Sequence, residues 1–417
     1  MLNYEEWLKI NMNLEKVYAI IALEENTIKV SVFARQTNET HCLAYEEAHV
    51  DFDIDFSAAK NINYKEIKNV LKDLLFKIDV FTKMPIDQYI LVASSLHLRK
   101  KDNCQSKKYQ AKNFDILLQD IRLDLFSHQT STYKTIFIDL KTWLVNGNKK
   151  VDQLDFNTEQ YDSIEFVYDE IKCSGEILRV INKLFSELNL DLLLILDHDL
   201  ILETLSINNG KTYFDINRAS TRVHAFKKKY ELNVGYNSII QDFKALFQID
   251  NETQITDLIN LYKIVKNETN SIPICNIYPG SYLEVTIINQ NLFKNNILNQ
   301  FTNNYLAKIQ GAINSKINDV CNPVIVARDE SYNFFKSQNV NCTLLEAAPI
   351  AFLQNYNIGI IQQAFNFYLQ HQLIKNSNRQ YSITKNIDNY IEHNQINKEL
   401  VLNFGIISTK LASKGGN

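Results

Sequence analysis

Two short polar turns and one Asp-His-Asp triplet are the places where this sequence carries residues able to do chemistry. The turns lie within Val17–Ala34 and Tyr213–Phe226, and apolar residues at the alternating spacing of strands flank both. The triplet Asp197-His198-Asp199 follows an apolar run, where a metal site or an acid–base pair is conceivable. No other histidine or aspartate is spaced to complete such a site. We therefore expect a polar turn there and predict no catalytic and no metal-binding residue.

The composition limits the classes of protein to which the chain can belong. At 417 residues it is long enough for two or more domains, and a hydrophobic content of 45% suffices for well-packed cores. A net charge of −4 offers no electrostatic attraction for a nucleic acid, so no such partner is expected. Only 10 residues are glycine, about a third of the roughly 7% norm, which leaves few loops able to wrap a phosphate closely.

The cysteines and the first residues of the chain indicate a cytoplasmic protein. None of the six cysteines forms a C-x-x-C pair, so we expect reduced, mostly buried thiols and no zinc or redox site. The stretch Met1–Asn13 contains acidic residues and lacks the long apolar run of a signal peptide. No apolar run approaches the roughly 18 residues that a transmembrane helix requires.

The spacing of apolar residues predicts a repeated α/β arrangement. The hairpin at Val17–Ala34 is followed by strands at Cys42–Ala48 and Tyr89–Ala93, with a helix at Tyr64–Ile78 between them. A similar hairpin, Tyr213–Phe226, lies about 200 residues later and suggests an internal duplication. Further helices are expected at Asn113–Phe126, Ser174–Asn189, Asn237–Phe247, Glu252–Val265, Gln290–Ser315 and Ile358–Gln370, and further strands at Tyr133–Val145, Lys149–Leu154, Ser163–Ile171, Asp191–Leu196, Tyr282–Ile288, Pro323–Ala327 and Thr343–Ala347.

Several polar stretches are expected to be loops or turns. The basic stretch Leu98–Lys112 reads as a solvated loop, and Lys227–Lys229 reads as the turn after the second hairpin. Asn146-Gly147 is a strong signal for a tight hairpin turn. The helix and strands around that turn look like a module inserted into the first half of the chain.

Three motifs then occur in the order in which one known family has them. From Asp215 to Phe226 the chain reads D-I-N-R-A-S-T-R-V-H-A-F, beside the family motif D-I-G-G-G-T-T-D-V-A-V-F. The inserted module, which follows near residue 95, contains WLVNGNKKVDQ at Trp143–Gln153. LNVGYNSIIQDF at Leu232–Phe243 is similar to the motif I-P-V-G-G-x-x-I-T-x-D-I. Over about residues 14–370 the chain resembles the FtsA family of bacterial cell-division proteins, which belongs to the actin superfamily.

The resemblance implies an α/β, actin-like fold, that is, a duplicated ribonuclease-H-like fold with two lobes and an inserted subdomain of the FtsA type. Three loops of this fold meet at one nucleotide cleft. The resemblance divides the chain into 1–94 with 172–205 and 357–375 as the first core subdomain (1A), 95–171 as the inserted subdomain (1C), 206–240 with 320–356 as the second core subdomain (2A), 241–319 as the peripheral subdomain (2B), 376–397 as a linker and 398–417 as a tail.

All three nucleotide loops of the family are altered in this chain. In the first, Ala22 replaces an aspartate that helps to hold the metal, Glu24 replaces a glycine and Glu25 replaces a hydroxyl residue. In the second, three glycines are replaced and Arg222 replaces the final aspartate, and in the adenosine motif three more glycines are replaced. The resemblance places the following residues at a vestigial nucleotide cleft: Ala22, Glu24, Glu25, Asn26, Asp215, Asn217, Arg218, Ser220, Thr221, Arg222, Gly235, Arg328, Asp329 and Glu330.

These replacements disfavour bound ATP, so we expect no cofactor, with ATP and Mg²⁺ as the alternative. Glycines let backbone N–H groups approach a phosphate with no side chain between. Glu24 and Glu25 would each add a repulsion on the order of 4 kcal/mol at about 4 Å from a phosphate charge. Mg²⁺ or an arginine could offset part of this, but Ala22 removes a carboxylate that would help to place the metal. Alternatively, Glu24 pairs with Arg218 or Arg222 across the cleft, or these side chains are solvated independently.

The resemblance implies an actin-like division protein that anchors FtsZ filaments to the inner membrane face and self-assembles into filaments, with a degenerate ATP site. Its FtsZ-binding surface would lie within residues 241–319. In the tail, four apolar residues recur at helical spacing among lysines and indicate a helix that lies on an anionic membrane: Leu400, Phe404, Ile407 and Leu411. The alternative, which the sequence supports equally well, is a tail that packs against the body of the protein. We thus expect a cytoplasmic protein, peripheral on the cell membrane; the alternatives are an active ATPase or kinase of the same fold and a PilM-like scaffold of another membrane machine.

Overall fold

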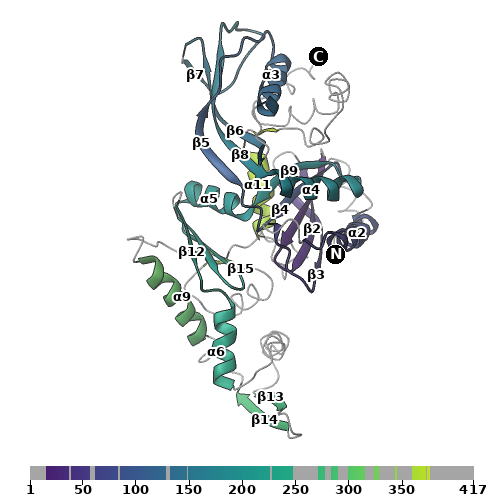
Figure 1. Ribbon diagram of the computed structural model, residues 1–417, viewed down its shortest axis with the longest axis vertical. Coiled ribbons are helices and arrows are strands. Elements are labelled where there is room, and N and C mark those ends of the chain that lie inside the picture. Colours follow the sequence, from purple (N-terminus) through teal and green to yellow (C-terminus); the bar gives the residue numbers. More distant parts are fainter. Residues whose placement is uncertain are drawn as a thin grey trace. The chain divides into compact units, whose positions relative to one another are not determined.

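The computed structural model describes residues 16–36, 39–56, 62–82, 85–127, 132–147, 149–225, 228–247, 271–277, 283–289, 299–314, 324–327, 343–344, 359–371 and 373–375 (Figure 1). The chain separates into two compact units. The first comprises Met1–Leu200 with Ile361–Asn417, and the second comprises Ile201–Ile360. The finer division into four subdomains remains a prediction.

The core of the first unit is a five-stranded sheet. Its strands, in the order β3-β2-β1-β4-β9, are β3 (Glu39–His49), β2 (Thr27–Gln36), β1 (Lys16–Glu24), β4 (Gln88–Ala93) and β9 (Leu192–Asp197). The first three run antiparallel to one another, and β4 and β9 run parallel to β1. The inner strands β1 and β4 are almost entirely buried on both faces, as expected for a sheet that is covered on both sides.

The second unit repeats this topology. Its sheet has the order β12-β11-β10-β15-β16, formed by β12 (Lys228–Leu232), β11 (Thr221–Ala225), β10 (Tyr213–Ile216), β15 (Val324–Ala327) and β16 (Thr343–Leu344). Strands β10, β11 and β12 are antiparallel, whereas β15 and β16 run parallel to β10. Equal strand order and equal directions confirm the duplication predicted from the two hairpins. The predicted turn at Lys227–Lys229 is wrong in part, because Lys228 and Lys229 begin β12.

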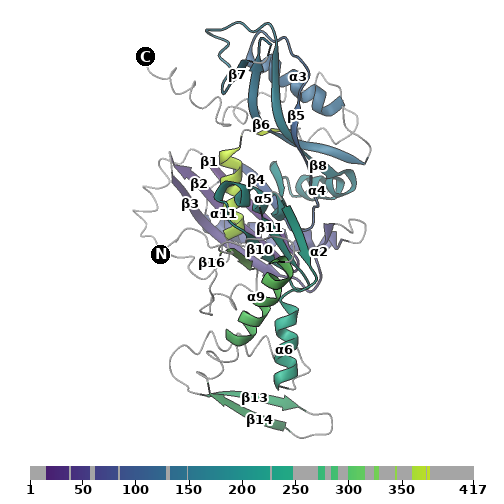
Figure 2. The same ribbon diagram turned by 90° about the vertical axis from the view of Figure 1, so that its left-hand side faces the viewer.

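Helices cover the first sheet. Helix α2 (Tyr64–Thr82) packs against β2 and β3, and α4 (Gly175–Glu187) begins at the N-cap Ser174, whose Oγ accepts from the Glu176 N–H at 3.3 Å. Helix α11 (Gly359–Gln370) lies across β1 and β2 in Figure 2. There the Phe365 ring contacts the rings of Tyr18 and Phe33 with centroids 5.3 and 5.2 Å away. These aromatic contacts fix α11 on the core sheet.

The inserted module has a sheet of its own, in the order β17-β6-β8-β5. It consists of β5 (Arg99–Gln105), β6 (Tyr133–Val145), β7 (Lys149–Val151), which also pairs with β6, β8 (Ile164–Ser174) and the distant strand β17 (Leu373–Lys375). The stretch Leu98–Lys112, predicted to be a loop, thus contains an edge strand. Residues 373–375 belong to this sheet and not to that of the core subdomain with which the sequence grouped them.

The core of the inserted module is aromatic. Helix α3 (Phe114–Ser127) packs with the fully buried Trp143 and with Phe166. The predicted turn at Asn146-Gly147 is confirmed, since both residues have positive φ angles, 48° and 83°, as a type I′ hairpin turn requires.

The rest of the second unit contains α6 (Asn237–Phe247), α9 (Asn299–Asn314) and the antiparallel hairpin of β13 (Ser271–Ile277) and β14 (Leu283–Asn289). The predicted helix at Glu252–Val265, the linker, the tail and its four apolar residues lie outside the described residues. Within the described part of the chain, no helix is both long and apolar enough to cross a membrane.

Candidate functional site

A buried ion pair occupies the first hairpin turn. The Lys29 Nζ lies 2.5 Å from the Glu24 Oε2, and both side chains are only 1% exposed. In the β1–β2 register Ala22 faces Lys29, and Glu24 lies two residues further along the same face. The small Ala22 thus stands beside the lysine stem. Lys29 thus balances the charge of Glu24 within the first unit, and this partner was not among those that the sequence analysis considered.

The sequence contains a signal for this pair. The turn between β1 and β2 has two residues, Glu25 and Asn26, and this loop length sets the register of the hairpin. In that register Glu24 and Lys29 are diagonal neighbours on one face. Lys29 stands between the apolar residues Ile28 and Val30 of β2, and a lysine in such surroundings indicates a buried partner.

The backbone of the first turn is held by the segment that follows β3. The Glu25 carbonyl accepts from the Ile54 N–H at 2.5 Å, and the Asn26 carbonyl accepts from the Val50 N–H at 2.9 Å. Glu25 and Asn26 are themselves half-buried. The turn is therefore a fixed part of the first unit and not a loose loop.

The second hairpin turn is closed by its own backbone and by helix α6. The Asn217 N–H donates to the Ser220 carbonyl at 2.9 Å. The Asn217 carbonyl accepts from the Tyr236 N–H at 3.0 Å, and the Arg218 carbonyl accepts from the Asn237 N–H at 2.9 Å. Free N–H groups at a turn or a helix start are what binds a phosphate. Here the N–H groups of Asn217, Tyr236 and Asn237 already have protein acceptors.

Gly235 makes this arrangement possible. A Cβ atom at this position would lie 2.4 Å from the Ala219 carbonyl carbon and 2.4 Å from the Arg218 oxygen. Only a residue without a side chain allows the backbone before α6 to approach the turn so closely. Gly235, which the sequence assigned to the nucleotide cleft, thus has a packing role in this structure.

The side chains of the second hairpin are engaged within their own unit. The fully buried Thr221 Oγ1 donates to the Val234 carbonyl at 2.6 Å and lies 2.7 Å from the Tyr305 hydroxyl of α9, whose pKa is raised by burial. The Arg222 Nε lies 3.7 Å from the Glu231 Oε1 on the neighbouring strand. Thr221 therefore faces the interior of the second unit.

The remaining predicted residues of this turn are divided between surface and core. The Arg218 Nε donates to the Asn237 Oδ1 at 3.2 Å, and the Ser220 Oγ lies 3.5 Å from the Glu231 Oε1. Asp215 is fully buried. The structure thus brings Ala22 to Asn26 together in the first unit and Asp215 to Gly235 together in the second. Arg328, Asp329 and Glu330 lie outside the described residues, and the predicted ion pair of Glu24 with Arg218 or Arg222 remains a prediction.

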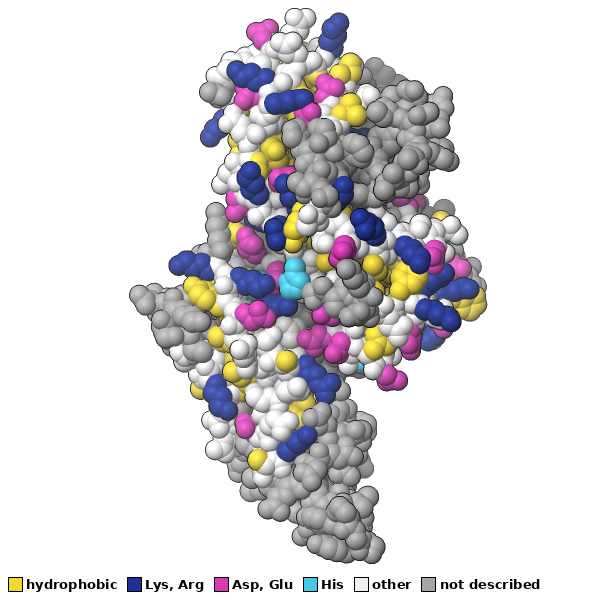
Figure 3. Space-filling view, viewed as in Figure 1, with side chains coloured by type: hydrophobic (Ala, Val, Ile, Leu, Met, Phe, Trp, Pro, Cys, Tyr) yellow, Lys and Arg dark blue, Asp and Glu magenta, His cyan; other side chains and the backbone are white. Residues whose placement is uncertain are grey.

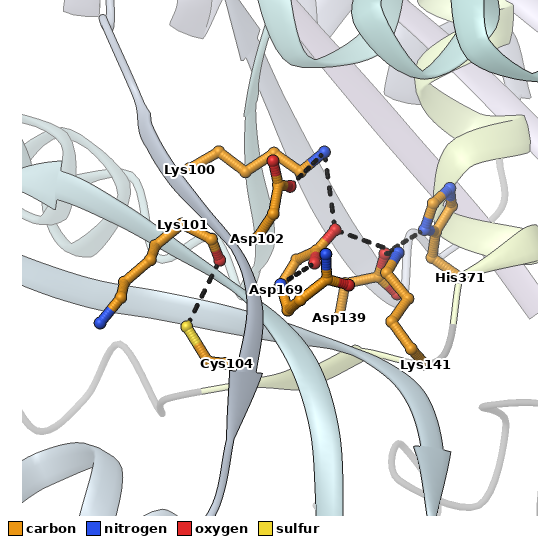
Figure 4. A network of polar contacts seen from close by, with 9 residues as sticks. Lys100, Lys101, Asp102, Cys104, Asp139, Lys141, Asp169 and His371 are labelled. Atoms are coloured by element: carbon orange, nitrogen blue, oxygen red, sulfur yellow. Dashed lines mark hydrogen bonds and ion pairs between the residues drawn. The ribbon is translucent and has the colours of Figure 1, made fainter. Parts of the chain in front are cut away.

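A charged network that the sequence did not reveal lies in the inserted module (Figure 4). The Asp139 Oδ2 lies 2.7 Å from the His371 Nδ1 and 2.5 Å from the Lys141 Nζ. The Lys141 Nζ also contacts the Asp169 Oδ2 at 3.3 Å, and this oxygen is 3.5 Å from the Lys100 Nζ. Asp139 and His371 are 232 residues apart in the chain, so no local spacing could relate them.

The cations of this network keep Asp139 ionised. Burial raises the pKa of the Asp139 carboxyl, but the hydrogen bond and charge of His371, together with Lys141, outweigh burial and hold that pKa below its ordinary value of 3.8. An ionised carboxylate only accepts, so the His371 Nδ1 donates. Among the described residues, no group of three or more histidine, cysteine, aspartate or glutamate residues could hold a metal ion. The network therefore links β6 and β8 to the end of α11.

The Asp-His-Asp triplet has a structural role. The Asp197 Oδ1 accepts from the Leu200 N–H at 2.8 Å, so Asp197 caps helix α5 (His198–Asn209), which the sequence did not predict. Its Oδ2 accepts from the Leu98 N–H at 2.8 Å. The expected polar turn is thus the direct junction of β9 and α5.

The three described cysteines are free thiols, as the sequence analysis expected. Cys42 and Cys173 are buried, burial raises the pKa of each to about 12, and Cys104 is a free, half-buried thiol. Over the face shown in Figure 3, lysine and arginine side chains lie interspersed with aspartate and glutamate side chains. The described part of this face therefore presents both signs of charge.

Comparisons with known proteins show similarity of structure. A scan against protein-family models and a search of curated proteins found no match. Among solved structures, a chain of a PilM-PilN type IV pilus biogenesis complex is similar at 8% identity with a TM-score of 0.43, over 85% of this chain and 98% of that chain. The ethanolamine utilization protein EutJ from Carboxydothermus hydrogenoformans is similar at 9% identity with a TM-score of 0.39, over 84% of this chain and 92% of that chain. MreB5 of Spiroplasma citri bound to ADP is similar at 8% identity with a TM-score of 0.39, over 85% of this chain and 96% of that chain.

The strand topology carries the assignment of the fold. Two units each contain three antiparallel strands followed by two parallel strands in the same order, which is the duplicated arrangement that the sequence predicted. The fold is actin-like. A relation to FtsA in particular remains a prediction.

Proposed function

We propose that this protein is an actin-fold scaffold that binds partner proteins and does not turn over ATP. The observation that carries the proposal is the second hairpin turn, where the N–H groups of Asn217, Tyr236 and Asn237 are already bonded within the protein. A nucleotide phosphate would have to compete with these bonds, and an unmade backbone hydrogen bond costs about 1–3 kcal/mol.

The first hairpin turn supports the same proposal. The Lys29 ammonium supplies a positive charge that is covalently part of the chain, and it contacts the Glu24 carboxylate in the interior. With Ala22 in place of an aspartate, this turn has lost a ligand for a hard divalent cation. A fold with both turns closed in this way retains its shape and its surfaces for binding.

Within this class, the sequence motifs favour a division protein. As a division protein, the chain anchors FtsZ filaments through residues 241–319 and contacts the inner membrane face through residues 398–417. A PilM-like scaffold of another membrane machine is the alternative, and the similarity to a chain of a PilM-PilN complex makes it the second candidate to test. An ATPase or kinase with an unusual pocket is the alternative from a different class.

Calorimetric titration with ATP and Mg²⁺ tests the scaffold proposal. We expect no heat of binding and no change in the unfolding temperature at 1 mM ATP, a concentration at which even a site with a Kd of about 10 μM would stabilise the fold by about 2.7 kcal/mol. The matched control is Gly235→Ala, which perturbs the closed turn directly. A micromolar Kd for the wild type that is lost in Gly235→Ala would contradict the proposal.

A further inference from the structure

Each of the two core sheets ends in a charged strand. Among the described residues, β3 is an end strand of the first sheet and β12 is an end strand of the second. Strand β3 carries Glu39, Glu46 and Glu47 and has no lysine or arginine. Strand β12 begins with Lys228 and Lys229. The two repeats thus place opposite charges on strands that occupy equivalent positions.

Both strands present a regular edge. From Ala44 to His49, β3 pairs with β2 without an irregularity, and β12 pairs with β11 along its whole length. The edge strand β5 differs, because its ladder is broken between Lys101 and Cys104, where Asn103 has a φ of 51°. A bulge of this kind blunts an edge against further pairing, whereas a regular edge can accept another strand.

The charges on the two strands match in number and direction. Glu46 and Glu47 are consecutive, so one carboxylate points to each face of the sheet, and the consecutive Lys228 and Lys229 do the same with their ammonium groups. Glu47, Lys228 and Lys229 are exposed, and Glu46 is half-buried. Side by side, the two strands would place one pair of opposite charges on each face. Two β3 strands or two β12 strands would place like charges together, which is unfavourable.

The carboxylates of Glu47 and Glu231 each have a partner within their own sheet. The Glu47 Oε2 accepts from the Tyr45 hydroxyl at 2.5 Å, which holds the carboxylate on the strand without neutralising it. The one carboxylate of β12, Glu231, lies 3.7 Å from the Arg222 Nε and is thereby balanced by its own sheet. The exposed Lys228 and Lys229 make the first half of β12 basic.

We propose that β3 of one copy of this chain pairs with β12 of a second copy. The inference rests on the proposed scaffold function and adds the surface through which copies assemble. The contact joins two unlike surfaces, so each bound copy exposes a fresh β3 and a fresh β12. Such a contact adds copies head to tail and gives a filament or a closed ring. Like-charge repulsion disfavours the pairing of β3 with β3 and of β12 with β12.

Sedimentation velocity of charge-reversed variants tests the pairing. Variant A carries Glu46→Lys and Glu47→Lys, so both of its edges are basic, and variant B carries Lys228→Glu and Lys229→Glu, so both of its edges are acidic. We expect the wild type to assemble at low salt and each variant alone to need at least about tenfold more protein, a cost of about 1.4 kcal/mol. An equimolar mixture of A and B should assemble again, because the basic β3 of A meets the acidic β12 of B.

A chain with all four reversals provides the second test, since it should assemble as the wild type does. Assembly should also weaken as salt screens the exposed charges. If the wild type assembles and A and B assemble equally well, the pairing of β3 with β12 is wrong, while the scaffold function stands. If the mixture of folded A and B stays monomeric while the wild type assembles, the pairing is also wrong. Micromolar binding of ATP would count against the proposed function alone.

Discussion

In the first hairpin, the negative charge of Glu24 is balanced by Lys29, a residue of the same hairpin. An exposed ion pair contributes little to stability, because water solvates both charges well. A buried pair is different, since each charge has lost its hydration and depends on its partner. At 1% exposure for both side chains, Glu24 and Lys29 depend on each other in this way.

Replacing Lys29 by methionine should therefore destabilise the first unit. Lys29→Met leaves the Glu24 carboxylate buried without the ammonium it contacts, and we expect a loss of about 3–5 kcal/mol in the free energy of unfolding by urea. The double replacement Glu24→Met with Lys29→Met should recover most of this loss, because apolar side chains of similar volume need no partner.

The matched control for this prediction is Lys68→Met. Lys68 contacts Glu187 at 2.6 Å on the surface, where both side chains are about a third exposed, 32% and 35%. Its loss should cost much less than the loss of Lys29, because water solvates both charges of an exposed pair. Equal effects of Lys29→Met and Lys68→Met would show that the buried pair does not hold the hairpin.

Among the elements, β17 is the one that connects distant parts of the first unit. It follows α11, which packs on the core sheet through Phe365, and it pairs with β6 of the inserted module. The Asp139–His371 contact lies at the junction between helix and strand. The C-terminal strand therefore fastens the inserted module to the core, and the chain continues from there toward the predicted linker.

Asp139→Asn should weaken this fastening in a pH-dependent manner. The pKa of Asp139 is depressed in the folded state, so its ionised form stabilises the fold above pH 3.8 and this contribution is lost as the pH falls through the depressed value. We expect the variant to be about 2 kcal/mol less stable than the wild type at pH 7, with the gap closing below pH 4. Urea unfolding as a function of pH measures the gap.

Asp102→Asn serves as the control at the exposed end of the same network, where the Asp102 side chain is 48% exposed and lies 3.1 Å from the Lys100 Nζ. It should have a small effect at every pH. A gap for Asp139→Asn that stays constant from pH 7 to pH 3 would contradict an ionic role for this contact.

At the scale of the whole molecule, two repeated sheets and one inserted sheet provide several surfaces, and both described hairpin turns have backbone groups that are bonded within the protein. These surfaces are where the proposed scaffold function would act. The predicted membrane contact and the predicted FtsZ contact lie in different stretches, 398–417 and 241–319, so they can be separated by truncation.

Flotation with liposomes of anionic lipid tests both contacts together. We expect the full chain to float with the liposomes and to carry FtsZ filaments with it, whereas the chain without residues 398–417 should bind FtsZ in solution and fail to float. The control is liposomes of neutral lipid, which should bind less because the tail lysines then lack an anionic surface. Flotation that is independent of the tail, or no co-flotation of FtsZ, would contradict the division role.

Local patterns in the sequence were sufficient for most strands and helices. The alternation of apolar residues predicted the hairpins of β1–β2 and β10–β11, and the 3.6-residue stripe predicted α2 and α11, because such patterns arise within a few residues of one another. The same reasoning missed β5, whose polar composition resembles a loop, and α5, whose start is set by the cap Asp197.

Contacts between distant segments could not be predicted in the same way. The closed turn at Asn217 depends on the approach of Gly235, the burial of Thr221 depends on Tyr305 of α9, and the Asp139–His371 contact spans 232 residues. In each case tertiary packing determines which residues meet, and such contacts do not follow any periodic pattern in the sequence. The residue types of the three altered loops already indicated that ATP would bind poorly. It took the tertiary structure to reveal that two of these turns are closed by hydrogen bonds and an ion pair of their own.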